Sequence, residues 1–197
     1  MNTLNCSQYR LSRCAREYLS EYNHILDRLI DGMTNVPLTN SISHNFIVQM
    51  IPHHQAAIEM SENLLSYTSC APLKNIASQI IREQTESIKN MRLAECACEK
   101  LLNSCQDVDL YSRKTEQIMN TMFDDMGKAP DDNQINIDFI REMIPHHEGA
   151  IRMSKNALKY DICPELCPIL LSIISSQERG VTQMKRLLSQ IERQKCG

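Results

Sequence analysis

Several residue types on which many folds depend are scarce in this chain of 197 residues. It has five glycines and no tryptophan, and aromatic residues make up 5% of the sequence. A β-sandwich needs turn glycines and strands rich in aromatic or β-branched residues, so the composition argues against one. Hydrophobic residues, at 42%, are numerous enough to form a packed core, and the eleven methionines are unusually many. The composition therefore favours an all-α protein.

The chain also lacks a basic excess and a long apolar run. Its net charge is −3 with both signs interspersed, whereas a nucleic-acid surface is basic and clustered. No apolar run reaches the length that spans a bilayer. Residues 1–16 contain no apolar signal core. These absences predict no nucleic-acid partner, no membrane span and a cytoplasmic protein, or an exported one from which a signal has been removed.

Cysteines are frequent but do not form a recognisable ligand motif. There are nine, an odd number, and no two are spaced as Cys-x-x-Cys. An odd count without an export signal predicts free thiols in a reducing compartment. We interpret most of them as small buried or exposed thiols, and as the next candidates if metal binding extends beyond the motif described below.

The most informative feature is a pentapeptide that occurs twice. Met-Ile-Pro-His-His stands at residues 50–54 and again 93 positions later at 143–147. Further identities at the same offset need no gap from Tyr18, which matches Tyr111, to Met91, which matches Met184. A gapless register of this length predicts two copies of one unit. We place an N-terminal extension at 1–17, unit one at 18–104 and unit two at 105–197, packed together as one globular bundle.

Apolar residues recur with helical periodicity along both units. The spacing predicts helices over about 11–33, 43–67 and 73–102 in the first unit. In the second unit it predicts helices over about 110–126 and 134–160, and a last helix that reaches about residue 194. No strand pattern occurs. Six helices joined by short loops predict an antiparallel bundle.

A proline interrupts the periodic pattern at the same place in each unit. Pro52 and Pro145 each remove a backbone donor and kink a helix that continues through them. The alternative is that the helix begins at the proline. Phe46, Ile47 and Met50 stay in phase with the residues that follow, which favours a continuous helix.

The repeated motif carries side chains that suit copper. Imidazole nitrogen and thioether sulfur are borderline and soft ligands, and Cu(I) is favoured where methionines dominate. One helical turn puts each methionine of the motif beside its two histidines. The candidate ligands are Met50, His53, His54, Met60 and Met91, and at the same offset Met143, His146, His147, Met153 and Met184.

Adjacent histidines on a helix point about 100° apart, which leaves three arrangements open. A kink at the proline lets both rings serve one site, or the two rings serve separate sites, or one binds metal while the other forms hydrogen bonds. A different hypothesis is a structural or protein-interaction module, in which the histidines bond to Gln84 and Gln177 and bind no metal.

Enzymatic chemistry fits the sequence less well. A di-iron carboxylate bundle needs Glu-x-x-His on two helices, and only Glu21 to His24 has this spacing. The chain has no His-Glu-x-x-His zinc motif, no phosphate-binding glycine loop and no Gly-x-Ser-x-Gly elbow. We therefore expect a binding protein rather than an enzyme, and the sequence leaves its oligomeric state open.

The string Phe-x-x-x-Met-Ile-Pro-His-His, followed by Ala-Ile-x-Met and then Gln-x6-Met, resembles domain-of-unknown-function family 305. It occurs at 46–60 with Gln84 and Met91, and at 139–153 with Gln177 and Met184. The resemblance implies a ferritin-like four-helix core built from two helical hairpins, with further helices outside it. It also implies a link to copper binding and tolerance for some members.

Two departures from the family pattern concern acidic residues. The Asp that usually precedes the Phe is Asp138 in unit two but Asn45 in unit one. The Glu that usually stands three residues after the Gln is replaced by Ser87 and by Gly180. The leading hypothesis is nevertheless a copper storage, buffering or resistance protein with one quasi-equivalent site at each His-His pair.

Overall fold

The fold is all-α, in a computed structural model that describes residues 11–130 and 132–195. No strand occurs in these ranges. The prediction of about six helices is confirmed, whereas residues 1–10 of the predicted N-terminal extension lie outside the described residues. The helices are α1 Arg13–Thr34, α2 Ile42–Leu65, α3 Ala71–Cys98, α4 Cys105–Met126, α5 Ile135–Ala157 and α6 Leu166–Lys195.

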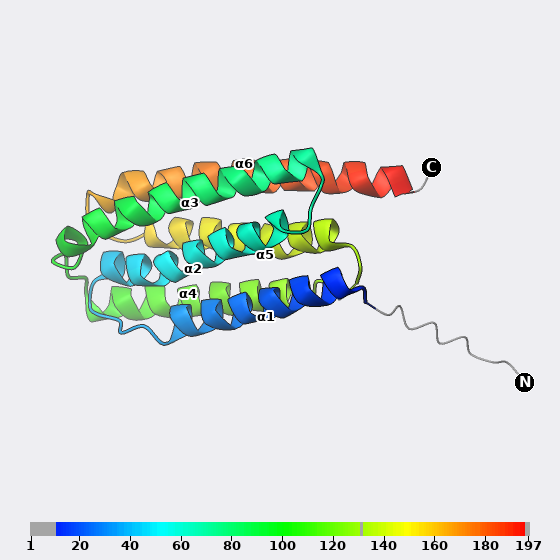
Figure 1. Cartoon of the computed structure of the whole chain (residues 1–197). Coiled ribbons are helices and arrows are strands. Elements are labelled where there is room, and N and C mark those ends of the chain that lie inside the picture. The colour runs from blue at the N-terminus through cyan, green and yellow to red at the C-terminus, as the bar shows by residue number, and fades with distance from the viewer. Residues whose placement is uncertain (1–10, 131, 196–197) are drawn as a thin grey trace, which may run out of the picture.

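The six helices form three layers of two (Figure 1). The α2–α5 pair lies in the middle, with α3 and α6 on one side and α1 and α4 on the other. Helix α2 packs against α1, α3 and α5, and α5 packs against α4, α6 and α2. Helix α3 also packs against α6, so α2, α3, α6 and α5 form a closed ring of four. Side chains on α2 and α5 are therefore enclosed on several sides.

Serine caps set the start of three helices. Ser12, Ser41 and Ser104 each accept a hydrogen bond from the backbone N–H three residues on, at 3.1–3.2 Å. Such a cap satisfies one of the donors that a helix start leaves unpaired. Ser104 explains why α4 begins at Cys105, five residues before the start near Leu110 that apolar periodicity predicted.

Helices α2 and α5 continue through their prolines. Pro52 lies inside Ile42–Leu65 and Pro145 inside Ile135–Ala157, so the alternative that a helix begins at each proline is wrong. Gly32 of α1 lies directly against Pro52, because a Cβ at Gly32 would stand 2.8 Å from the proline Cβ. This close approach places α1 directly against α2 at Pro52.

Equivalent contacts recur 93 positions apart. The Nδ2 of Asn63 donates to the Tyr18 carbonyl at 3.0 Å, and the Nδ2 of Asn156 donates to the Tyr111 carbonyl at 3.2 Å. Edge-to-face ring pairs join Tyr18 to Tyr67 and Tyr111 to Tyr160 at centroid distances of 6.1 and 5.9 Å. Residues at matching positions thus make matching contacts.

Among the described residues, none of the helices combines the length and apolar character that crossing a bilayer requires. The apolar side chains instead form one large buried cluster drawn from all six helices.

Candidate metal centre

The centre of the bundle is a reciprocal histidine pair that joins α2 to α5. The Nε2 of His53 lies 3.2 Å from the carbonyl oxygen of His146, and the Nε2 of His146 lies 3.1 Å from the carbonyl oxygen of His53. The ring centroids are 3.7 Å apart, with 31° between the planes. Both side chains are completely buried. The two helices are therefore connected at their midpoints by a symmetrical exchange of hydrogen bonds.

This exchange fixes the protonation of both rings. A carbonyl oxygen only accepts, so each Nε2 carries the proton and donates it. Each Nδ1 is then an unprotonated acceptor, and neither has a hydrogen-bond partner in the described parts of the chain. His53 and His146 therefore connect α2 to α5 through their Nε2 atoms. The Nδ1 atom of each ring keeps a lone pair that accepts no hydrogen bond from the described residues.

The neighbouring histidines face a different environment. His54 and His147 line a cavity of about 20 Å³ enclosed by α2, α3, α5 and α6. A cavity needs roughly 10–15 Å³ to hold one water, so this one has room for a single water or ion. The Nε2 of His54 lies 3.0 Å from the Ser87 hydroxyl of α3. Gly180 of α6 stands at the matching position, and a Cβ there would lie 2.9 Å from Cδ2 of His147.

Two buried glutamines, one from α3 and one from α6, also line this cavity. Gln84 and Gln177 each expose only 3% of their surface. The Oε1 atom of each is buried and accepts no hydrogen bond from any described residue. Leaving a buried amide oxygen without a partner costs about 1–3 kcal/mol, and both oxygens are free to accept a hydrogen bond or to ligate a cation. The predicted hydrogen bonds from these glutamines to the histidines are absent from the described structure.

Burial keeps all four rings neutral. Desolvation lowers the pKa of His54 to about 3 and that of His146 to about 4. It also holds the pKa values of His53 and His147 well below 6.5, and nearby imidazoles lower them further. Neutral imidazole is the form that binds metal, so these rings need not lose a proton at neutral pH to become ligands.

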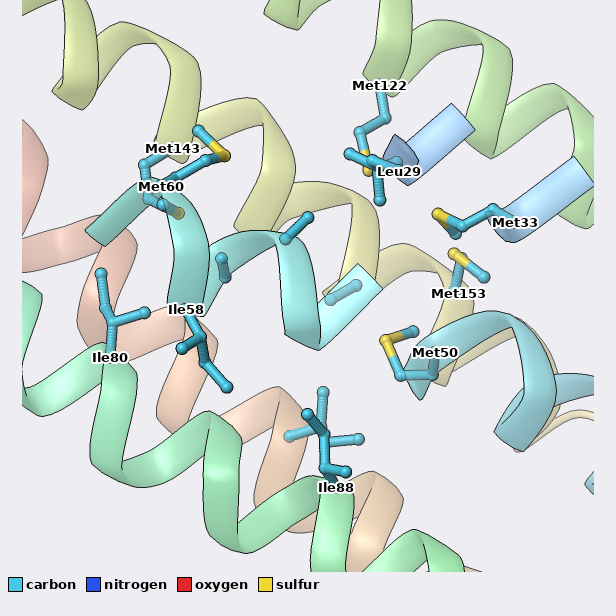
Figure 2. Packing of buried hydrophobic residues seen from close by; sticks show 14 of the residues in the cluster. Leu29, Met33, Met50, Ile58, Met60, Ile80, Ile88, Met122, Met143 and Met153 are labelled. Carbon is cyan, nitrogen blue, oxygen red and sulfur yellow. The ribbon is translucent and has the colours of Figure 1, made fainter. Parts of the chain in front are cut away.

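The candidate methionines lie elsewhere. Met50, Met60, Met91, Met143, Met153 and Met184 are at most 1% exposed and belong to the apolar cluster, part of which Figure 2 shows. None of them lines the small cavity. Their surroundings match those of methionines that fill a core. Their role as ligands stays a prediction.

Acidic and thiol ligands are not gathered at the centre. In the described parts of the chain, no three His, Cys, Asp or Glu side chains form a group that could hold a metal ion. The described cysteines are all free thiols, and among them Cys98 and Cys163 are buried. The polar side chains that line the cavity are imidazoles, amides and serine hydroxyls, and Glu83 is the one charged side chain among them.

Some residues of the site were missed by reasoning from sequence. Ser87 and Gly180 were noted only as departures from the family pattern, yet they face His54 and His147. Glu142, buried on α5, accepts a 2.6 Å hydrogen bond from the Tyr18 hydroxyl. A signal for it existed, since a glutamate directly before the repeated pentapeptide replaces Gln49 of the first copy.

These observations define an all-α bundle organised around buried histidines, and the comparisons agree. The family model described as "Domain of unknown function (DUF305)" matches residues 43–188, and the chain belongs to this family. Its structure is similar to "CopM in the Cu(I)-bound form", with 30% identity, 78% of this chain and 98% of that chain covered and a TM-score of 0.55. "CopM in the Ag-bound form" matches at 29% identity over 77% and 98% of the chains, with a TM-score of 0.56.

A more distant structure supports the fold alone. A DUF305 fragment from Deinococcus radiodurans is 20% identical, with 78% of this chain and 99% of that chain covered and a TM-score of 0.55. The search of curated proteins found no match.

Proposed function

We propose that this protein binds one copper ion in the cavity between His54 and His147 and serves in copper storage, buffering or resistance. The observation that carries the proposal is the cavity itself, which two neutral imidazoles and two unpartnered glutamine oxygens line and which has room for one ion. Copper-bound and silver-bound forms of CopM, a protein of similar structure, support the same class of ligand.

The charge of the inner wall favours Cu(I) over Cu(II). The Born cost of burying an ion rises with the square of its charge, so a dication costs about four times as much as a monocation. The one acidic side chain that lines the cavity, Glu83, is partly exposed and lies 3.6 Å from Arg179, so it offsets little of this cost. Two imidazoles suffice for a two-coordinate monovalent ion, and imidazole is a suitable copper ligand.

We also propose that the chain evolved by duplication of a three-helix unit and that its ring of four helices is a ferritin-like core. The gapless offset of 93, the matching tyrosine and asparagine contacts and the reciprocal histidine bonds support this interpretation. The duplication would place the shared cavity between equivalent residues of both units. One site per chain then replaces the two separate sites expected from the sequence.

Anaerobic titration with Cu(I) against a competing chelator tests the proposal. Reactive thiols are first alkylated under native conditions, because free cysteines bind the same ion. We expect the wild-type chain to bind one ion more than the His54→Gln/His147→Gln variant. His24→Gln, which changes an exposed histidine, is the matched control and should bind as the wild type does. Circular dichroism checks that helicity is retained.

The second candidate is a structural or interaction module without metal. The reciprocal bonds of His53 and His146 favour it, because two of the four histidines already have hydrogen-bond partners across the helix pair. Equal Cu(I) binding by the wild type and the double variant would reject the cavity as the site. If neither protein binds Cu(I), the structural or interaction module is the candidate that remains.

A further inference from the structure

A second hollow lies directly against the histidine cavity. It is a cleft of about 280 Å³ between α3 and α6, which we call the α3–α6 cleft. Glu83, Ser87 and Ser176 line both the cavity and the cleft. The two spaces therefore share a wall formed by these three residues.

One carboxylate stands where the two spaces meet. The Oε1 of Glu83 accepts a 2.9 Å hydrogen bond from Gln79 and lies 3.6 Å from a guanidinium nitrogen of Arg179. Its side chain is 33% exposed, so it faces solvent as well as the cavity wall. The position on α6 that matches Glu83 is Ser176. The boundary between the cavity and the cleft therefore has a carboxylate on its α3 side and a hydroxyl on its α6 side.

The ion pair at this position is weak. Both side chains are partly exposed, at 33% and 55%, and such pairs contribute little to stability. Arg179 can therefore leave Glu83 at little cost and be replaced by another cation. Gln84 and Gln177, which line the same cavity as Glu83, are 3% exposed, and their Oε1 atoms have no hydrogen-bond partner among the described residues.

We infer that the copper ion reaches the histidines through the α3–α6 cleft, with the Glu83 carboxylate as its transient first ligand and Arg179 as the cation that it displaces. This inference rests on the proposed function and adds the route to the site. Glu83 raises the local concentration of a cation, whereas Arg179 opposes it, and both effects act on the rate of loading. The ion then passes from the carboxylate to the neutral donors of the cavity.

The cleft provides matched controls for both residues. Arg82 and Glu86 also line it, so changing either one alters the charge of the cleft by the same amount as changing Arg179 or Glu83. The ion pair that the structure gives Glu86 is with Lys89, at 3.5 Å, and not with the Glu83–Arg179 pair. If the loading rate of Arg179→Gln differs from that of Arg82→Gln, or that of Glu83→Gln from that of Glu86→Gln, the difference comes from the Glu83–Arg179 contact. The net charge of the cleft changes equally within each comparison.

The experiment measures loading rates with Ag(I), a redox-inert monovalent probe. Alkylated protein is mixed rapidly with Ag(I) and quenched with excess thiol, and the ions bound per chain are counted by native mass spectrometry. We expect Glu83→Gln to slow loading by about three- to tenfold and Arg179→Gln to accelerate it by a similar factor, each relative to its control. Added salt should reduce both effects, and the final occupancy should stay unchanged.

Three results would overturn the inference. Rates equal to those of the controls would exclude the local contact. A loss of affinity in Glu83→Gln as large as its loss of rate would make Glu83 a resident ligand. Equal Ag(I) occupancy in the wild type and in His54→Gln/His147→Gln, measured at equilibrium, would reject the proposed function as well, so the two failures are distinguishable.

Discussion

The four buried histidines should make the stability of this bundle steeply dependent on pH. Each is neutral in the folded protein, with pKa values of about 3 for His54 and about 4 for His146, and those of His53 and His147 also well below 6.5. In the unfolded chain the same rings titrate near 6.5. The unfolded state therefore takes up protons first as the pH falls. The stability that neutral burial preserves is full above about pH 6.5 and is lost as the pH falls toward the folded values.

The magnitude follows from the number of rings. Each one changes the free energy of unfolding by about 1.4 kcal/mol per pH unit once the pH is below its unfolded pKa. Four rings together remove about 5 kcal/mol between pH 7.5 and 5.5. Total stabilities of small proteins are about 5–15 kcal/mol, so a mildly acidic medium should remove much of the stability.

Urea denaturation followed by circular dichroism at pH 7.5, 6.5 and 5.5 measures this dependence. Near pH 5.5 the slope should correspond to uptake of about three to four protons on unfolding. In His54→Gln/His147→Gln the slope should fall by about two protons, which separates the histidines from any buried carboxylate. An unchanged unfolding midpoint over this range, or the same slope in the variant, would refute the reasoning.

Two further predictions concern single sites. Gly180→Ala places a Cβ 2.9 Å from His147, so we expect it to displace the ring and weaken Cu(I) binding in the chelator competition by about tenfold or more, with helicity retained. Tyr18→Phe removes the 2.6 Å hydrogen bond to Glu142 and should cost about 1–3 kcal/mol in urea denaturation. Tyr111→Phe, 93 positions away, removes a hydroxyl that makes no such bond to a carboxylate and should cost less.

The helices could be predicted from sequence because apolar periodicity depends on each segment alone. The bounds of α2 and α5, 42–65 and 135–157, differ by one to three residues from the predicted ranges, about 43–67 and 134–160, and both prolines were placed inside helices. The pattern could not show that α2 and α5 form the middle layer. Helical projection gives one apolar stripe, whereas Asn45 and Gln49 are buried off that stripe because three neighbouring helices enclose α2.

For a related reason, the sequence could not show which histidine of each His-His pair forms hydrogen bonds and which lines a cavity. Projection separates His53 from His54 by about 100° but does not say which helix each ring meets. The antiparallel crossing of α2 and α5 directs His53 and His146 at each other's backbone, and it leaves His54 and His147 directed toward α3 and α6. In each pair one ring therefore bonds to the backbone of the other central helix and the second ring lines the cavity, which is compatible with the arrangement in which one ring forms hydrogen bonds and the other binds metal.

Ser87 and Gly180, which stand where the family usually has a glutamate, lie directly against two of the buried histidines. Any side chain at Ser87 or Gly180 lies against the ring of His54 or His147, respectively. A glutamate at either position would bring a negative charge to the imidazole, which would favour a protonated ring or a more highly charged ion. With serine and glycine in these places, neither position adds a charge beside the rings. The two departures from the family pattern are therefore consistent with the proposed monovalent ion, and Gly180→Ala tests whether the space beside His147 is needed.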